Sequence, residues 1–363
     1  MNKKILITGC GGYLGSYLLP FLLKKGYDVQ GHDINFFKDC NLFKSNNIEN
    51  LIKYKDSENY ILSDIKSADI IIHLAGISND PLNSLTAEKV YDPTRVYSLK
   101  LAKICKEHNK KFIFASSCSV YGASKTKNLL NENSDTNPQT GYSLNKLQIE
   151  QDLESIASKN FFPICLRFAT IFGVSPRMRF DIVINMLVGM GLTEKEIKLN
   201  SDGRAWRPNL YIEDACLAIE RAMNYEKQSE DYKILILNVG RNDNNLRIID
   251  IAEIIQKLIP NSKLKFLNEA LQKSEDKIFF DRKIKKGKDN RTYKVSFDKL
   301  KQKFGNICNY TVEEGVKKML FDLNRIDFNN KKFKYNGFYR LQYLESLFEK
   351  NLINDDLKWR NKI

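Results

Sequence analysis

A tyrosine and a lysine four residues apart are the two side chains of this sequence best suited to moving a proton. They lie in the segment Thr140-Gly141-Tyr142-Ser143-Leu144-Asn145-Lys146. In a helix, positions i and i+4 share one face, so the Lys146 ammonium would lie beside the Tyr142 phenol. A free tyrosine titrates near ~10, and a nearby cation lowers that pKa by favouring the phenolate. Such a base could deprotonate a sugar or alcohol hydroxyl while a hydride leaves the same carbon, although a solvated helix face can show the same spacing.

The elements that must position this pair begin with a glycine-rich turn. Residues 3–8 are apolar and β-prone, and residues 16–25 form an apolar helical stretch. Glycines between a strand and a helix are typical of a dinucleotide site, where one allows the tight turn and another lets the pyrophosphate approach the backbone. The pyrophosphate would lie at the helix N-terminus, whose free N–H groups and dipole attract anions. The residues expected at the dinucleotide are Gly9, Gly12, Tyr13, Leu14 and Gly15.

An acidic residue follows the second predicted strand, residues 28–33. Asp33 lies about 20 residues beyond the glycines, where an acid binds the adenosine ribose hydroxyls and repels a 2′-phosphate. We therefore expect NAD rather than NADP, although an acid can also simply end a strand. Asp56 and Ser57 follow a third predicted strand, residues 51–55, and are placed to contact the adenine. Asp64 is a rival for this role, but we expect it on a helix.

Two further apolar stretches predict buried strands that end in small or hydroxyl-bearing residues. Residues 70–74 precede a small-residue turn, which lets a cofactor pass close to the backbone. Residues 111–115 precede a serine-rich segment, and hydroxyls at the carboxyl end of a parallel strand lie in the ligand crevice of an open α/β sheet. For any single serine, a role in the turn is the plainer interpretation. The residues concerned are Leu74, Ala75, Gly76, Ser116, Ser117 and Ser119.

Alternation of strands and helices sets the fold class. Residues 86–109 predict a helix, which we expect to start only near Thr94 because of Pro93. Residues 163–169 predict a sixth strand. Strands alternating with helices after a glycine-rich first turn predict an α/β fold with a doubly wound parallel sheet.

Composition limits the class of protein. The chain has 363 residues, of which 42% are hydrophobic, and no apolar run approaches the ~20 residues needed to span a bilayer. Seven cysteines without a secretory signal predict reduced thiols in a cytoplasmic protein, and with three histidines we expect no metal site. The net charge of +14 is spread along the chain, with a denser patch at residues 283–288. We interpret it as compositional bias with some attraction for an anionic ligand, and expect neither nucleic-acid binding nor membrane insertion.

The motifs together resemble a known family, the extended short-chain dehydrogenases/reductases of the NAD-dependent sugar-nucleotide epimerase/dehydratase group. The resemblance covers about residues 3–320 and implies a Rossmann-type fold with bound NAD. It also implies that Ser117 hydrogen-bonds the reacting hydroxyl, that Tyr142 shuttles the proton and that Lys146 binds the nicotinamide ribose. The motifs are Thr8-Gly9-x-x-Gly12-x-x-Gly15, His73-Leu74-Ala75-Gly76, Ser116-Ser117-Cys118-Ser119-Val120-Tyr121-Gly122, Tyr142-x-x-x-Lys146 and Leu166-Arg167-Phe168-Ala169-Thr170-Ile171-Phe172-Gly173.

Some positions depart from the family pattern. The 4,6-dehydratases carry Asp-Glu directly after the catalytic hydroxyl residue, and this chain has Cys118-Ser119 there. Without that acid pair, elimination of water is disfavoured, and so is decarboxylation, whose enzymes usually carry a glutamate in that segment. Thr94 replaces a common asparagine, and Thr170 replaces an asparagine near the substrate phosphates of the UDP-galactose 4-epimerases.

The second half resembles the part of the family that holds the nucleotide sugar. Arginine suits a diphosphate because its planar fork donates two hydrogen bonds, although each arginine could equally form a surface ion pair. The resemblance predicts an NAD-binding domain in residues 1–175 with returning segments near 209–240, a mainly substrate-binding domain in residues 176–325, and a helical extension in residues 326–363. The apolar stripe of that extension predicts docking on the body of the protein or, alternatively, a subunit contact. The expected substrate residues are Ser117, Ser119, Thr170, Asn185, Arg204, Arg207 and Arg291.

We expect from the resemblance an NAD-dependent epimerase acting at C4 of a nucleotide hexose through a 4-keto sugar. A dehydrogenase or reductase of the same substrate class remains the alternative, and a non-catalytic NAD-binding protein is disfavoured by the intact Ser117, Tyr142 and Lys146. Relatives usually dimerise through the helix that carries the tyrosine, so we also expect a homodimer.

Overall fold

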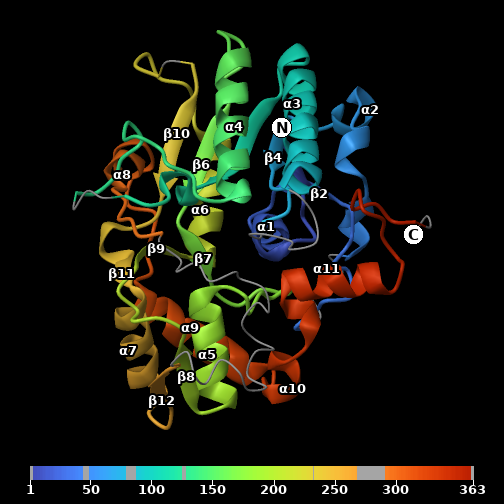
Figure 1. Cartoon of the computed structure of the whole chain (residues 1–363). Helices are drawn as coiled ribbons and strands as arrows, with labels where there is room; N and C mark the ends of the chain where they lie inside the picture. Colours follow the sequence, from blue (N-terminus) through green and yellow to red (C-terminus); the bar gives the residue numbers. More distant parts are fainter. Residues whose placement is uncertain are drawn as a thin grey trace.

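A seven-stranded parallel sheet forms the centre of the upper half of the molecule (Figure 1). The computed structural model describes residues 3–43, 49–78, 87–124, 128–231, 233–267 and 291–360. The doubly wound α/β fold predicted from the sequence is confirmed. In spatial order the strands are β10 (Leu235–Val239), β6 (Ile164–Phe168), β5 (Lys111–Ser117), β4 (Ile70–His73), β1 (Lys4–Thr8), β2 (Asp28–Asp33) and β3 (Ile52–Tyr54).

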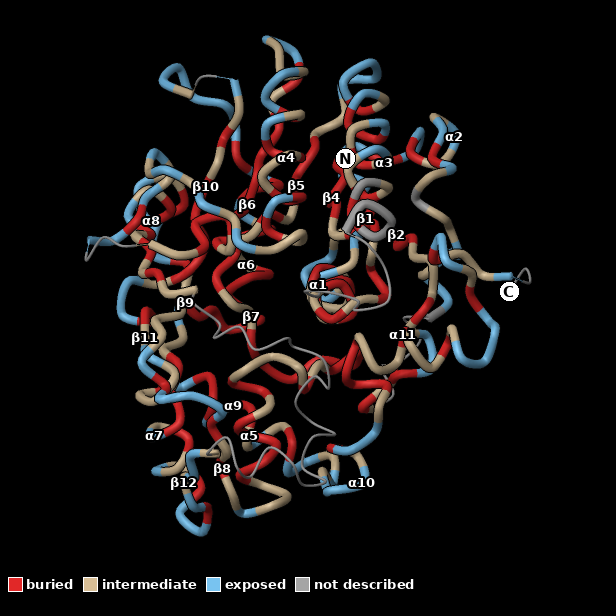
Figure 2. Tube along the Cα trace, viewed as in Figure 1, coloured by how far each residue is buried: buried red, intermediate tan, exposed pale blue. Residues whose placement is uncertain are grey.

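Helices cover both faces of this sheet, which explains why its central strands are nearly continuous apolar runs. One face packs against α1 (Tyr13–Lys24) and α6 (Ile212–Asn224). The other packs against α3 (Ala87–Glu107) and α4 (Gly141–Ile156), which lie side by side (Figure 1). The strands and the inner sides of these helices are buried, and the outer sides are exposed (Figure 2).

The lower half has its own apolar core beneath the carboxyl edge of the sheet (Figures 1 and 2). Phe172, Phe180 and Ile184 are fully buried in it. Two small sheets contribute, β11-β9-β7 and β12-β8. The elements of this half are β7 (Thr170–Phe172), α5 (Val183–Thr193), β8 (Glu196–Leu199), β9 (Trp206–Tyr211), β11 (Asn245–Arg247), α7 (Ile248–Leu258), β12 (Lys263–Phe266) and α9 (Val312–Arg325). Helix α8 (Asp298–Phe304) instead packs beside β10 in the upper half (Figure 1).

The C-terminal segment, residues 330–360, docks on the body of the protein. It contains α10 (Asn330–Phe333), the short 3-10 helix η7 (Asn336–Phe338) and α11 (Arg340–Glu349). The stripe residues Leu344 and Leu347 are buried with Phe36 and Tyr91 in one apolar cluster. The docked interpretation of the stripe is therefore confirmed, while the assignment of three domains stays a prediction.

The expected start of the third helix was wrong. Helix α3 begins at Ala87 and contains Pro93 in its interior. Proline removes one intrahelical hydrogen bond, but Tyr91 in the preceding turn is buried against α11 and so anchors that turn from outside the helix. Residues 91 and 344 are so far apart in the sequence that no local sequence pattern could have predicted their packing in one cluster.

The sequence also predicted no membrane-spanning segment and no metal site. No helix in the described ranges is long and apolar enough to cross a membrane. The described residues contain no cluster of three or more histidine, cysteine or acidic side chains arranged to hold a metal ion. The basic patch at residues 283–288 lies outside the described residues.

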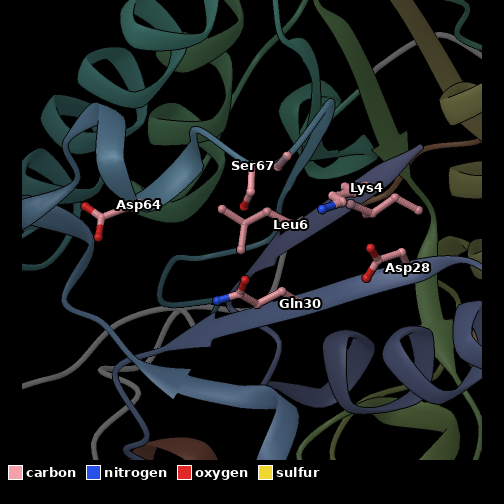
Figure 3. A pocket seen from close by; sticks show the side chains of 8 residues that line it. Lys4, Leu6, Asp28, Gln30, Asp64 and Ser67 are labelled. Carbon is pink, nitrogen blue, oxygen red and sulfur yellow. The ribbon is translucent and has the colours of Figure 1, made fainter. Parts of the chain in front are cut away.

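A small cavity of about 120 Å³ opens at the opposite, amino edge of the sheet (Figure 3). Its lining includes Lys4 and Asp28, the first residues of β1 and β2, together with Asp64 from α2 (Leu62–Ile65). Asp64 forms an ion pair with Lys55 at 2.8 Å. The expected position of Asp64 on a helix is confirmed.

Candidate active site

The carboxyl ends of four neighbouring strands bring the expected site residues to one edge of the sheet. In the register of the sheet, Thr8 of β1 pairs with His32 on one side and His73 on the other. His73 in turn pairs with Phe114 of β5, three residues before Ser117. The glycine-rich turn, Asp33, the turn after β4 and the serine segment therefore share the edge where ligands bind in open α/β sheets.

The glycine-rich turn fits a dinucleotide. Gly9 has φ +72°, and a Cβ there would lie 2.6 Å from the Ala75 backbone nitrogen. A Cβ at Gly15 would lie 2.5 Å from the Cys10 Cα, so α1 packs closely on the turn. A Cβ at Gly12 would meet only the Gly9 carbonyl oxygen, at 3.2 Å, which leaves that side of the backbone open. The positive φ of Gly9 agrees with the expected tight turn, and the approach of a pyrophosphate to the backbone stays a prediction.

The N-terminus of α1 has no capping group of its own. No side chain caps Gly12, and the first turn carries no acidic residue. The backbone N–H groups at Tyr13 and Leu14 thus begin a helix whose positive end is not neutralised, which suits an anion such as pyrophosphate. The Tyr13 hydroxyl points elsewhere and donates to the Gly173 carbonyl oxygen at 2.6 Å. Any contribution of Tyr13 to the cofactor therefore comes from its backbone.

Asp33 is held beside the turn by backbone donors. The Gly11 N–H donates to Oδ2 at 2.9 Å, and the Asn35 N–H donates to Oδ1 at 2.7 Å. Burial raises the pKa of the carboxyl, and these two bonds oppose the rise. A carboxylate has further lone pairs, so Asp33 keeps the capacity to accept ribose hydroxyls.

Residues after β3 form a short 3-10 helix, η2 (Ser57–Asn59), at the same edge. The Asp56 side chain caps it by accepting from the Glu58 N–H at 3.2 Å. Ser57 is its first residue. The two residues assigned to the adenine thus directly follow the strand that pairs with β2.

A buried histidine network, which the sequence did not reveal, fixes the end of β4. His73 Nδ1 lies 2.7 Å from the Thr8 hydroxyl, and Nε2 lies 2.8 Å from the Ser98 hydroxyl. Ser98 donates to the Thr94 carbonyl oxygen at 2.6 Å, so its oxygen accepts from His73 Nε2–H. Burial, followed by the Lys146 charge, lowers the His73 pKa to about 3, so the ring is neutral.

That network anchors the small-residue turn after β4. The Leu74 N–H donates to the Thr8 carbonyl oxygen at 3.0 Å. Ala75 follows against Gly9, and Gly76 is exposed with φ +149°. The backbone of this turn is thereby accessible beside the glycine-rich turn.

The tyrosine and lysine lie on α4 as the spacing predicted. Thr140 caps the helix by accepting from the Ser143 N–H at 3.2 Å. Lys146 Nζ lies 5.7 Å from the centre of the Tyr142 ring and donates to the Ala115 carbonyl oxygen at 2.7 Å. Burial lowers the Lys146 pKa to about 8, with Glu150 opposing the shift. At neutral pH the lysine is still a cation beside the half-buried phenol.

The serines after β5 point to different places. Successive residues of a strand face opposite sides, and the Ser116 hydroxyl donates to buried Glu150, away from the ligand edge. Ser117 is half-buried, and its Oγ accepts from the Ser119 N–H at 3.1 Å. The Ser119 Oγ is buried and has no hydrogen-bond partner in the described part of the chain.

Arg167 and Glu150 support this segment from below, and sequence patterns did not identify the pair. The Arg167 guanidinium donates to both Glu150 oxygens, with the shortest distance 2.6 Å from Nη2 to Oε2. Its Nη1 donates to the Tyr121 hydroxyl at 3.0 Å. The Cys118 thiol donates to the Arg167 carbonyl oxygen at 3.0 Å. The pair therefore fixes α4, β6 and the serine segment relative to one another.

The residues assigned to the substrate lie in several environments. Asn185 is fully buried, and its Oδ1 accepts from the Gly173 N–H at 3.0 Å. Its Nδ2 donates to the Tyr13 hydroxyl and the Arg179 carbonyl oxygen, at 3.1 and 2.9 Å. The Asn185 amide is thus committed to positioning the chain, which leaves its assigned contact with substrate a prediction without geometric support.

The expected arginines divide into two groups. Arg207 and Arg291 are brought together, because Arg207 Nη1 donates to the Arg291 carbonyl oxygen. Arg204 is exposed, and its Nε lies 3.8 Å from Asp202 Oδ2. Thr170, in β7, is half-buried and pairs with Asn209 of β9. The contacts of these residues with substrate stay predictions.

Comparison with known proteins decides the family. The family model described as "NAD dependent epimerase/dehydratase family" matches residues 5–240. The chain belongs to this family. It is therefore an NAD-dependent enzyme of the sugar-nucleotide epimerase/dehydratase group, as the resemblance implied.

Individual relatives agree with this assignment. An uncharacterized UDP-glucose epimerase of Bacillus subtilis, YtcB, is 32% identical over 228 residues, 60% of this chain and 71% of that protein. The fold resembles the NDP-hexosamine 5,6-dehydratase TunA, with TM-score 0.72 and 20% identity over 90% of this chain and 99% of that chain. It also resembles the UDP-glucuronic acid 4-epimerase of Bacillus cereus, with TM-score 0.70 and 23% identity over 89% and 99%. Both structural likenesses concern the fold.

Proposed function

We propose that this protein is a sugar-nucleotide epimerase that inverts C4 of an NDP-hexose through a 4-keto intermediate. The observation that carries the proposal is the Tyr142–Lys146 pair on a capped helix, at the same edge as Ser117, with no acid following that serine. The name of the Bacillus subtilis relative, a UDP-glucose epimerase, supports the same reaction class.

The proposed roles follow from the positions of the side chains. Ser117 donates its hydroxyl proton toward the C4 oxygen, because its Oγ already accepts from the Ser119 N–H. Tyr142 removes the C4 hydroxyl proton and later returns it. Lys146 favours the phenolate by its charge. The nicotinamide of a bound NAD would supply the hydride acceptor and donor that the change at C4 requires.

The residues of the glycine-rich turn and Asp33 hold the cofactor in this proposal. The backbone at Gly12, Tyr13 and Leu14 takes the pyrophosphate, and Asp33 takes the adenosine ribose. Rotation of the keto sugar between the two hydride transfers then needs no further catalytic group. Arg207 and Arg291 are the candidates to retain the nucleotide diphosphate meanwhile.

The segment directly after Ser117 offers no carboxylic acid for a dehydratase reaction. Cys118 is 1% exposed, and its thiol is bonded to the Arg167 carbonyl oxygen. The Ser119 hydroxyl cannot protonate a leaving hydroxyl as readily as a carboxylic acid, because its pKa is far higher. Elimination across C5–C6 is therefore unsupported by this segment.

The test is a product analysis without added cofactor. Purified protein is incubated separately with UDP-glucose, UDP-galactose and UDP-glucuronic acid, and products are resolved by anion-exchange chromatography and proton NMR. Epimerisation should give the same product ratio from either C4 epimer with no net NADH. A keto sugar formed with stoichiometric NADH would instead assign a 4-dehydrogenase, and a 4-keto-6-deoxy sugar would assign a dehydratase.

We also propose a homodimer formed through α3 and α4. The two helices are tied together by Arg95, whose guanidinium donates to both Asp152 oxygens at 2.6 and 2.8 Å. Their surface carries two exposed apolar side chains, Val96 and Leu144. Light scattering should give twice the chain mass, and a Val96→Glu/Leu144→Glu variant should give the chain mass. Monomeric wild-type protein at micromolar concentration would reject this assembly.

A further inference from the structure

The C-terminal segment lies along residues that flank the dinucleotide site. Trp359 Nε1–H donates to the carbonyl oxygen of Ile34, the residue after Asp33, at 2.7 Å. The Lys358 ammonium lies 2.6 Å from a Glu58 carboxylate oxygen, in the 3-10 helix that follows Asp56. The segment thus binds both loops that were assigned to the adenosine.

The same segment also reaches the catalytic end of the site. Tyr142 packs at the edge of the apolar cluster formed by Phe36, Tyr91, Leu344 and Leu347. In Figure 1, α11 lies below α1 and the chain then turns toward the loops after β2 and β3. The C-terminal segment therefore packs against residues that lie far apart along the predicted dinucleotide site.

Arg340, the first residue of α11, is buried, and its guanidinium lacks a full set of hydrogen-bond acceptors among the described residues. It is 5% exposed, and its guanidinium carbon lies 3.9 Å from the centre of the Phe37 ring. Nη2 donates to the Arg177 carbonyl oxygen at 3.0 Å. Nη1 is buried and has no hydrogen-bond partner within the described residues. An unsatisfied donor on a buried cation is costly unless a ligand satisfies it.

Neighbouring charges do not neutralise Arg340. The nearby Asp181 carboxylate is already bonded by the Arg179 guanidinium, at 2.8 and 3.1 Å. Burial, and then the Arg179 charge, lowers the Arg340 pKa to about 10, with Asp181 opposing the shift. Arg177 is a further buried cation of the same cluster, and its side chain donates to the Lys38 carbonyl oxygen. The cluster has more positive than negative groups.

The cluster lies against the start of α1. The Arg177 N–H donates to the Ser16 hydroxyl at 3.2 Å, in the first turns of that helix. The Arg340 charge opposes the rise that burial causes in the pKa of both Tyr13, the first residue of α1, and Asp33, which accepts from the Gly11 N–H. The uncapped N-terminus of α1 therefore lies near a buried guanidinium whose Nη1 has no hydrogen-bond partner among the described residues.

We propose that Arg340 donates its Nη1–H to the pyrophosphate of NAD, which makes the first residue of α11 part of the cofactor site. Arg207 and Arg291 belong to a different part of the molecule, between β9 and the chain near residue 292, and remain the candidates for the nucleotide-sugar diphosphate. The inference uses the NAD dependence of the family and does not depend on which reaction the enzyme catalyses. A consequence is that the docked C-terminal segment helps to retain NAD.

The test measures cofactor binding directly. NAD is removed from the full chain, and rebinding of NAD, ADP-ribose and UDP-glucose is measured by calorimetry for wild type, Arg340→Gln and Arg340→Lys. Arg340→Gln removes a hydrogen bond between charged groups. We therefore expect it to lower the affinity for NAD and for ADP-ribose by about ten- to hundredfold. Arg340→Lys should lose less, and UDP-glucose affinity should stay nearly unchanged, because Arg207 and Arg291 are the candidates for the nucleotide-sugar diphosphate.

A matched control and a stability measurement separate ligand binding from folding. Arg360→Gln changes an exposed arginine of the same segment and should leave NAD affinity unchanged. Melting is measured with and without NAD, because a ligand-binding role predicts a smaller NAD-induced rise in melting temperature for Arg340→Gln. An unchanged NAD affinity would overturn the proposal, whether or not the variant is less stable. A loss confined to UDP-glucose would overturn it too, by assigning Arg340 to the substrate.

Discussion

The Lys146 ammonium donates to the Ala115 carbonyl oxygen while it lies beside the Tyr142 ring. This bond anchors the lysine between α4 and the strand that ends in Ser117. Burial there lowers the Lys146 pKa to about 8. The charge that is proposed to activate Tyr142 is thus present at neutral pH and is removed in mildly alkaline solution.

The first prediction is an alkaline loss of activity. As pH rises through about 8, Lys146 loses its proton, so kcat/KM should fall. In the unfolded chain the lysine keeps its proton up to about 10.4, so this group's contribution to the free energy of unfolding rises between the two values. Activity should therefore decline while circular dichroism still shows a folded protein. A flat kcat/KM profile from pH 7 to 9.5 would contradict the assigned role of the lysine.

The second prediction concerns the proposed base. Tyr142→Phe removes the phenol and should lower kcat by about 10²–10⁴-fold, the usual contribution of acid–base catalysis. NAD binding should persist, because the ring still packs against the apolar cluster around Leu344. Tyr27→Phe is the matched control, since the Tyr27 hydroxyl bonds Glu220 at 3.3 Å and not a site residue. Rapid-quench measurement of product formation separates chemistry from binding, and near-normal turnover in Tyr142→Phe would exclude the assignment.

The third prediction concerns cofactor choice. Asp33→Asn removes the negative charge at the end of β2, so discrimination against NADP should decrease while NAD binds more weakly. The asparagine side chain also places its NH₂ group against one of the two backbone donors, the Gly11 or the Asn35 N–H, so one hydrogen bond is lost. The free energy of unfolding should therefore fall by about 1–3 kcal/mol. Asp64→Asn, on α2, is the control and should leave the ratio of the two affinities unchanged. Calorimetric titration with both nucleotides gives that ratio.

The fourth prediction concerns the buried ion pair below the site. Glu150→Gln leaves the Arg167 charge uncompensated and should cost about 3–5 kcal/mol of unfolding free energy. Because Glu150 raises the Lys146 pKa, the alkaline limb of kcat/KM should also move to lower pH. Asp250→Asn breaks a more exposed pair with Arg247, which solvent screens, and should cost far less. Denaturant unfolding curves measure both costs, and equal losses in the two variants would argue against the buried pair as a main support.

Much of the fold and part of the site could be predicted because they depend on local sequence. The glycine-rich turn needs particular residues within a few positions, since a Cβ at Gly9 would collide with backbone. The Tyr142–Lys146 spacing depends only on helical periodicity, which the Thr140 cap starts in the correct place. The strands were recognisable because burial on both faces demands continuous apolar runs.

The remaining partners were decided by tertiary structure, because each joins chain segments that no short pattern connects. Arg340 lies 163 residues from the carbonyl oxygen of Arg177 that it bonds. His73 needs Thr8 on one side and Ser98 on the other, and only the order of the strands brings Thr8 to it. An isolated sequence position shows the chemical type of a side chain, but its burial, its charge state and its partners depend on which distant segment folds against it. In this protein the sequence alone predicted a dinucleotide-binding fold with a tyrosine as the base, and only the tertiary structure placed Arg340 in a buried cluster against the start of α1.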